Sequence, residues 1–174
     1  MKKIIALILV LTVSLALFAC GDDKPEKGEV KKGKVAAEEY FKNDVLETKY
    51  AKIEITDVKI IQPGEAGNEY SDKPVIAFWY KATNKTDEEL DPNGAWFNNF
   101  VAYQDNDSDR INELNVGSLP DDKFLDTQSE IIKKGGTVEN AVCYELDDLE
   151  TPVLLKAVSE ISGDKIGSKE YSIK

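Results

Sequence analysis

The sequence predicts an all-β domain built as an antiparallel β-sandwich of about seven or eight strands. Two observations predict it. From residue 50 onward, apolar residues recur mostly at every second position, which is the period of a half-buried strand. Turn-forming residues separate these segments every 8 to 15 residues or so, a spacing typical of sandwiches and unlike the alternating strands and helices of α/β folds.

The first strands are expected between residues 44 and 83. Residues 35–50 suit either a short helix or an entry strand, and we favour an irregular start followed by a strand near 44–49. In residues 50–62 the alternation changes phase between Thr56 and Asp57, which predicts a β-bulge there. Residues 74–83 are apolar on both faces and therefore predict a central strand.

The middle of the chain is less regular. Residues 91–94 (DPNG) predict a turn, and residues 95–104 predict a further buried strand. Residues 105–126 form the longest polar stretch and have no clear period. We expect a long surface connection there, with one helical turn.

Four further strands complete the expected sandwich. Residues 129–134 and 137–146 flank Gly135 and Gly136, which predicts a hairpin with a tight turn. In its second strand, the pattern places one set of apolar residues on a shared face: Val138, Val142, Tyr144 and Leu146. Residues 151–161 predict a strand, and a last edge strand is expected near 169–173.

The N-terminus has the three parts of a bacterial secretory leader. Lys2 and Lys3 precede about 15 apolar or small residues at 4–18, fewer than the 20 or so that a membrane-spanning helix needs. The next residues resemble the lipobox of bacterial lipoproteins, in which cleavage falls just before a cysteine: Leu17, Phe18, Ala19 and Cys20. Phe18 departs from the smaller residue usual there. An ordinary signal peptide with an incidental cysteine, or an uncleaved anchor, is the alternative.

The lipobox resemblance implies a division into three parts. Residues 1–19 are the signal peptide, and Cys20 becomes an N-terminus that carries diacylglycerol and palmitate-like acyl chains. Residues 20–34 are a polar, flexible linker, and residues 35–174 form the domain. Two or more acyl chains hold a protein firmly to a membrane. The predicted location is therefore the extracellular face of the cytoplasmic membrane.

Composition excludes several functions. Residues 35–174 contain 15 basic and 29 acidic residues, a net charge of −14, so the domain repels nucleic acid and anionic lipid head groups. The chain has no histidine, which excludes the Ser-His-Asp and Cys-His mechanisms and removes the commonest zinc ligand. If Cys20 is acylated, Cys143 has no disulfide partner.

Several blocks of the sequence resemble a family of immunoglobulin-like lipoproteins of unknown function from Gram-positive bacteria. The blocks lie within residues 45–158 and include KIEITDVKIIQPGE, DKPVIAFWYKATNKTDEELDP, FVAYQDND, LNVGSLPDD and IIKKGGTVENAVCYELDDLETPVLLKA. The resemblance implies an immunoglobulin-like β-sandwich behind a lipid anchor. It implies no activity and no site residues.

One acidic loop is a candidate calcium site. Asp105, Asp107 and Asp109 alternate and offer oxygen ligands. An EF-hand loop needs Gly at its sixth position and Glu at its twelfth, where this chain has Arg110 and Val116. A site of another design would draw on more distant carboxylates: Asp121, Asp122 and Asp126. A solvated acidic loop is the alternative.

Other chemistry is weaker in the sequence. Cys143 lies among carboxylates that disfavour a thiolate, so we expect a small buried side chain rather than a nucleophile. Trp79 and Trp96 suit either the core or a groove for a peptide or sugar, and the core is favoured. The predicted function is a non-enzymatic, tethered module that binds a protein, peptide or cell-wall component. A calcium-dependent surface module is the first alternative, and a carboxylate-based envelope hydrolase is the second.

Overall fold

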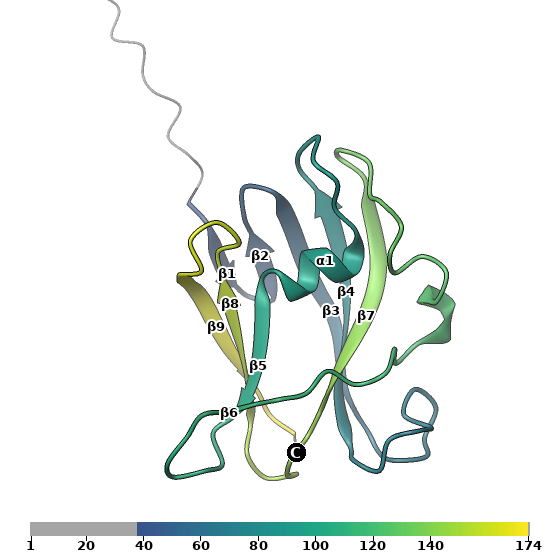
Figure 1. Ribbon diagram of the computed structural model, residues 1–174, viewed down its shortest axis with the longest axis vertical. Coiled ribbons are helices and arrows are strands. Elements are labelled where there is room, and N and C mark those ends of the chain that lie inside the picture. Colours follow the sequence, from purple (N-terminus) through teal and green to yellow (C-terminus); the bar gives the residue numbers. More distant parts are fainter. Residues whose placement is uncertain (1–37, 174) are drawn as a thin grey trace, which may run out of the picture. The chain divides into compact units, whose positions relative to one another are not determined.

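The computed structural model describes residues 38–173. The predicted signal peptide, the lipobox with Cys20, and the linker lie outside the described residues. The domain contains nine strands, one short α-helix and one 3-10 turn (Figure 1). They are β1 (Tyr40–Lys42), β2 (Val45–Glu47), β3 (Ala51–Ile61), β4 (Val75–Asn84), α1 (Pro92–Phe97), β5 (Phe100–Gln104), β6 (Asn112–Glu113), η1 (Asp122–Phe124), β7 (Thr137–Glu145), β8 (Val153–Val158) and β9 (Lys165–Tyr171).

The expected all-β fold is confirmed, with the strands joined into one curled sheet. The strand order is β6-β5-β8-β9-β1-β2-β3-β4-β7. Neighbouring strands are antiparallel except β1 and β9, which are parallel and meet at Phe41 and Gly167. A side chain at position 167 would collide with the backbone of Phe41, because its Cβ would lie 2.5 Å from the Phe41 carbonyl oxygen. Glycine therefore permits the contact that joins the two halves of the sheet.

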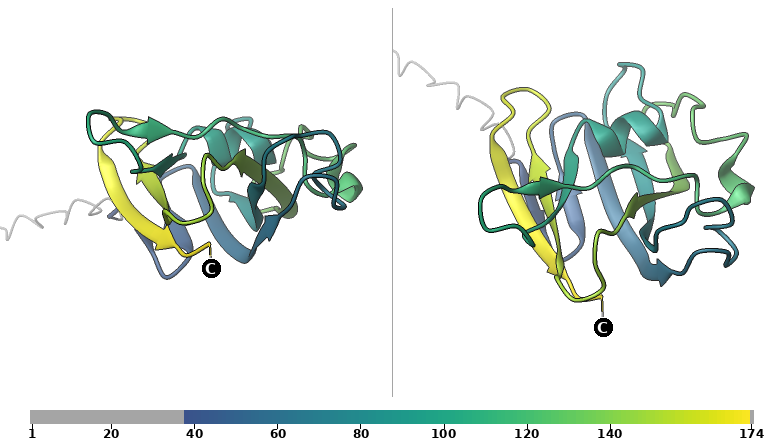
Figure 2. Two further views of the ribbon diagram at one scale, coloured as in Figure 1. Left: turned by 90° about the horizontal axis from the view of Figure 1, so that it is seen from below. Right: turned by 60° about the horizontal axis from the view of Figure 1, so that its bottom comes forward.

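The curl brings the two halves of the sheet face to face around one core (Figure 2). Phe78 of β4 and Tyr171 of β9 pack edge to face with ring centroids 5.1 Å apart. Trp96 of α1 is fully buried in the same core, 5.4 Å from Phe78, and its indole N–H donates to the Tyr144 hydroxyl at 2.8 Å. Two packed layers of strands are thus obtained from a single sheet.

The two long strands form as the sequence predicts. Side chains alternate along β3 and β4, and the register shifts at Thr56, where the bulge was expected. β4 lies between β3 and β7 and is buried along most of its length, which confirms it as a central strand.

The strand expected near 44–49 is confirmed as β2, but the irregular start expected before it is another strand, β1. The two form a hairpin whose turn residues Asn43 and Asp44 both have positive φ, as a tight type I′ turn requires. Three other local predictions are corrected. Residues 95–104 are only partly strand. Asp91 caps α1 by accepting from the Gly94 N–H at 2.8 Å, and Pro92 occupies the first turn, so the strand begins only at Phe100.

The expected hairpin around residues 135–136 is also corrected. Residues 129–134 form no strand, and Ile132 instead packs in the core with its N–H bonded to the Leu90 carbonyl at 2.8 Å. β7 pairs with β4 and not with a strand at residues 129–134. The last strand, β9, begins earlier than expected and lies inside the sheet between β8 and β1, where the Asp44 carboxylate accepts from Tyr171 at 2.6 Å.

Candidate functional site

An open pocket lies over Trp79, on the face of β3 and β4 that points away from the core. We call it the Trp79 pocket. Its volume is about 310 Å³, and it is lined by Thr56, Asp57, Lys59, Trp79, Tyr80, Asp121, Lys123, Phe124, Glu139 and Asn140. Trp79 is half-buried and packs beside Ala77 and Cys143, a small apolar cluster separate from the main core. Strand alternation explains this placement, because the neighbouring Phe78 and Tyr80 face the core.

The ring of Trp79 is held in one orientation. Its indole N–H donates to the Asp121 carboxylate at 3.0 Å. Asp121 is itself fixed as the cap of η1, where it accepts from the Lys123 N–H at 3.3 Å. At the bulge, the Thr56 hydroxyl donates to the Trp79 carbonyl at 3.1 Å. The pocket therefore presents an aromatic side chain that does not need to be ordered when a ligand arrives.

Four of the five charged residues that line the pocket form two ion pairs, and the fifth, Glu139, pairs at 3.7 Å with Lys81 outside the lining. Lys59 pairs with Asp57 at 2.9 Å, and its ammonium lies 4.9 Å from the centroid of the Trp79 ring. Lys123 pairs with Asp121 at 3.2 Å. The hydrogen bond from Lys59 lowers the pKa of the Asp57 carboxyl. Burial raises the pKa of Asp121, but hydrogen bonds from Trp79 and Lys123 outweigh it, so its pKa also lies below the ordinary value.

Behind the pocket, on the core face of β4 and β7, an amide oxygen lacks a hydrogen-bond partner among the described residues. Asn140 is fully buried, and its Nδ2 donates to the Tyr80 hydroxyl and to Asn93, both at 3.0 Å. Its Oδ1 has no hydrogen-bond partner among the described residues. Burial raises the pKa of Tyr80, so its hydroxyl stays protonated and donates to the Pro92 carbonyl at 2.9 Å. A buried acceptor of this kind is costly unless water or a ligand donates to it.

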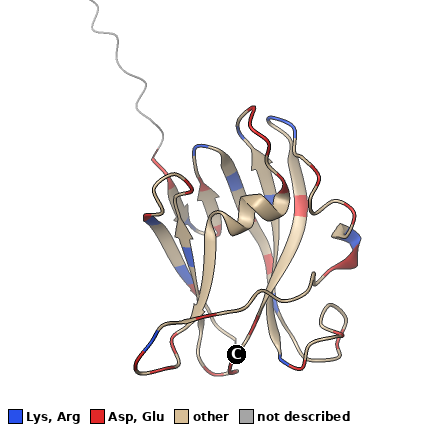
Figure 3. Cartoon of the chain, in the orientation of Figure 1, with Lys and Arg blue, Asp and Glu red and all other residues tan. Residues whose placement is uncertain are grey.

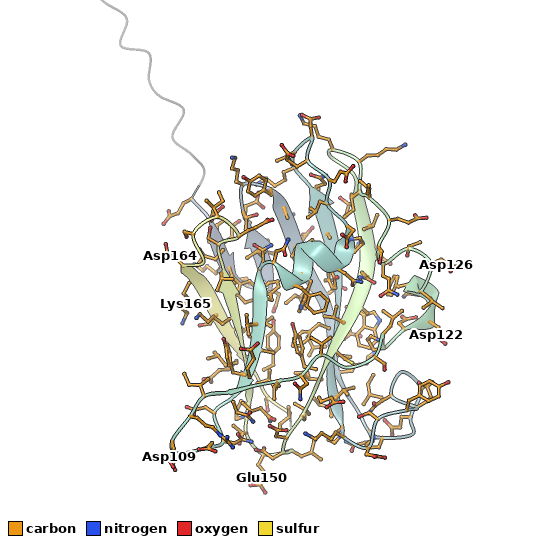
Figure 4. The ribbon with its side chains drawn as sticks, viewed as in Figure 1. Asp109, Asp122, Asp126, Glu150, Asp164 and Lys165 are labelled. Atoms are coloured by element: carbon orange, nitrogen blue, oxygen red, sulfur yellow. The ribbon has the colours of Figure 1, made fainter. Side chains whose placement is uncertain are left out.

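The predicted calcium residues do not converge. Asp107 accepts from the Asp109 N–H and from Arg110, both at 2.9 Å. Within residues 38–173, no three acidic or cysteine side chains are grouped closely enough to hold a metal ion. Asp109 lies at the tip of its loop, while Asp122 and Asp126 lie on the other side of the domain (Figure 4). Calcium binding through Asp105, Asp107 and Asp109 stays an untested alternative to a solvated acidic loop.

The two aromatic candidates have different roles, and the cysteine is buried. Trp96 fills the core, as expected, whereas Trp79 lines the pocket. The Cys143 thiol is buried 2.9 Å from the Ser118 carbonyl, and burial raises its pKa to about 12. Sequence reasoning missed Asp121 and Lys59 as partners of Trp79. The alternation of β3 indicated which face Lys59 occupies. The contact between Trp79 and Asp121 joins residues 42 positions apart, so no local pattern predicts it.

Among residues 38–173, no helix has the length and apolar character needed to cross a membrane.

Residues 26–159 match the family "Domain of unknown function (DUF5067)". No curated protein matches. A solved structure described as a "putative lipoprotein" from Staphylococcus aureus subsp. aureus NCTC 8325 is similar, with a TM-score of 0.65 and 24% sequence identity over 78% of this chain and 92% of that chain. This likeness shows a shared fold.

Proposed function

The chain belongs to the DUF5067 family, and on this premise we propose that it is a lipid-anchored, non-catalytic binding module whose ligand occupies the Trp79 pocket. The proposed location is the extracellular face of the cytoplasmic membrane of a Gram-positive cell. The immunoglobulin-like character implied by the sequence resemblance is part of the same proposal. It is supported by the two halves of the sheet that pack around one core.

The anchor is supported by the sequence at residues 17–20 and by the polar segment after it. The Staphylococcus aureus protein that shares the fold carries a lipoprotein description, which agrees with this location. Residues 21–34, which follow Cys20, are mostly polar or charged, as a tether requires. A module tethered in this way works close to the membrane and beneath or within the cell wall.

The ligand is inferred from the fixed ring of Trp79 in a pocket whose charges are already paired. Lys59 and Lys123 each have a carboxylate partner, so a charged ligand would have to displace an existing ion pair. A neutral ligand with an apolar face and several hydroxyl or amide groups would not. Sugar rings stack on indole and form hydrogen bonds with planar carboxylate groups; on Trp79 a sugar would take the place of the Lys59 ammonium over the ring. We therefore infer that the ligand is a neutral glycan of the cell wall.

A non-catalytic role is supported by the state of the carboxylates. A glycoside hydrolase needs one carboxylic acid with a raised pKa to protonate the leaving group. The pKa values of Asp57 and Asp121 are lowered, and no aspartate or glutamate is buried among the described residues. The chain also lacks histidine. These features favour binding over hydrolysis.

Titration calorimetry of the intact acylated protein in detergent micelles tests the proposal. Chitotetraose, a neutral N-acetylglucosamine oligomer, should bind, and Trp79→Ala should weaken binding at least about tenfold because aromatic anchors dominate binding energies. Tyr70→Ala removes an exposed aromatic outside the pocket and should leave the affinity unchanged. Equal binding by wild type and Trp79→Ala, or slow cleavage of the oligomer, would overturn the proposal.

A further inference from the structure

A second concave surface lies beside the Trp79 pocket, across the segment that contains η1. We call it the Tyr70 surface. It is a pocket of about 280 Å³ between the β3–β4 loop and residues 118–125, which lie on the same side of the domain (Figure 1). Tyr70 is 92% exposed and Leu125 is 62% exposed. The remaining lining residues are Gly67, Asn68, Glu69, Ser71, Ser118, Leu119 and Asp122. Large apolar side chains left in solvent together commonly mark an interaction site.

The loop that carries Tyr70 is fixed rather than loose. Asn68 is buried, and its Nδ2 donates to the Ile61 carbonyl at 3.2 Å and to the Lys73 carbonyl at 2.9 Å. Gly67 has φ +90°, and a Cβ there would lie 2.4 Å from the Pro120 carbonyl oxygen, so the two loops touch. The position of the Tyr70 surface is thus set before binding, which reduces the entropy lost when a partner docks.

The charges of the Tyr70 surface are unpaired, in contrast to those of the Trp79 pocket. Its charged lining residues are Glu69 and Asp122, and neither forms an ion pair with any described residue. An adjoining pocket is also lined by Glu69 and Asp122 and adds Asp121, with no basic residue. Figure 3 shows acidic residues on η1 and on the neighbouring loop. A partner can therefore supply the positive charge that the Tyr70 surface lacks.

We propose that the Tyr70 surface docks a basic protein segment in which Lys or Arg residues flank an apolar side chain. The apolar side chain packs between Tyr70 and Leu125, and the flanking cations pair with Glu69 and Asp122. The net charge of −14 on residues 35–174 attracts such a partner over a longer range. This inference does not depend on the glycan proposed for the Trp79 pocket.

Charge also decides against other occupants. A second copy of this chain would bring its own Glu69 and Asp122 to the contact, and like charges repel. Anionic lipid head groups are repelled for the same reason. A neutral glycan would cover the two carboxylates without compensating them, which carries a desolvation cost. A basic segment satisfies both the apolar and the charged parts of the surface.

Three acetylated and amidated peptides test the proposal: Lys-Leu-Lys-Phe-Lys, Lys-Ser-Lys-Ser-Lys and Glu-Leu-Glu-Phe-Glu. They are titrated into the intact acylated protein in nanodiscs of zwitterionic lipid, which do not attract cationic peptides. The basic apolar peptide should bind at least about tenfold more tightly than either of the others, because only it matches both features. Its affinity should fall as salt is raised.

Variants locate the binding. Tyr70→Ala with Leu125→Ala, and separately Glu69→Gln with Asp122→Asn, should each weaken binding of the basic apolar peptide about tenfold or more. Ile161→Ala, at another exposed apolar side chain, should not. Circular dichroism confirms that each variant is folded. Equal affinities for the three peptides, or loss of binding in Ile161→Ala alone, would overturn the proposal, and neither result bears on glycan binding.

Discussion

Replacing Gln104 with methionine should destabilise the domain by about 3 kcal/mol. Gln104 is fully buried in β5, and its amide holds the loop before β8. Nε2 donates to the Thr151 carbonyl at 2.8 Å and the Asp148 carbonyl at 3.1 Å, and Oε1 accepts from the Asp147 N–H at 2.8 Å. Each of these three bonds contributes about 1 kcal/mol. Methionine nearly conserves the volume, so the loss comes from hydrogen bonds rather than from a cavity.

Urea unfolding of the intact protein, followed by tryptophan fluorescence, measures this effect. At a slope of about 2 kcal/mol per molar, the unfolding midpoint should fall by about 1.5 M. Gln62→Met is the matched control, because Gln62 is exposed and its side chain makes no hydrogen bond with the described residues. A free energy of unfolding for Gln104→Met within about 0.5 kcal/mol of wild type would refute the role assigned to this amide.

Three further predictions concern acid stability, the anchor and calcium. Hydrogen bonds, chiefly from the Thr151 N–H, hold the pKa of Asp148 at about 2, so its stabilisation is full above about pH 4 and is lost as the pH falls through 2. Wild type should therefore lose more stability than Asp148→Asn between pH 4 and 2 in urea titrations, and equal losses would count against this role. Cys20→Ala should release the protein into the medium or leave an uncut precursor, whereas a bare thiol in intact-mass spectra of wild type would contradict acylation. Because Asp107 is already paired with Arg110, we expect an unchanged melting midpoint in millimolar calcium. A bound ion at 100 times its dissociation constant would add about 2.7 kcal/mol to the free energy of unfolding. A rise in the midpoint that Asp107→Asn abolishes would establish the site.

The long strands were predictable because their patterns are local. The apolar alternation of β3 and the apolar run on both faces of β4 identified the two strands, and the phase change at Thr56 located the bulge. α1 was not predictable in the same way. Its six residues are too few to show a helical period, and an Asp-Pro start is equally typical of a turn. Residues 129–134 contain two adjacent isoleucines, of which only Ile132 is buried, so the pattern resembled a strand without being one.

The candidate site was only half predictable. The sequence identified Trp79 as a residue for either a core or a groove, but β4 is apolar on both faces, and its pattern does not say which face lies in the main core. The face is decided by the curl of the sheet, which depends on the distant contact between Phe41 and Gly167. The hydrogen bond from Trp79 to Asp121 is likewise set by tertiary structure. Fold class follows from local periodicity, whereas the pocket follows from long-range packing.

The indole N–H signals of the two tryptophans in a ¹H–¹⁵N spectrum of the intact protein test the central claim most directly. The Trp79 N–H donates to Asp121 in the pocket, and the Trp96 N–H donates to Tyr144 in the core. Addition of chitotetraose should shift the Trp79 signal in a saturable way and leave the Trp96 signal in place. A Trp79 signal that does not move at saturating oligomer would contradict glycan binding in the Trp79 pocket.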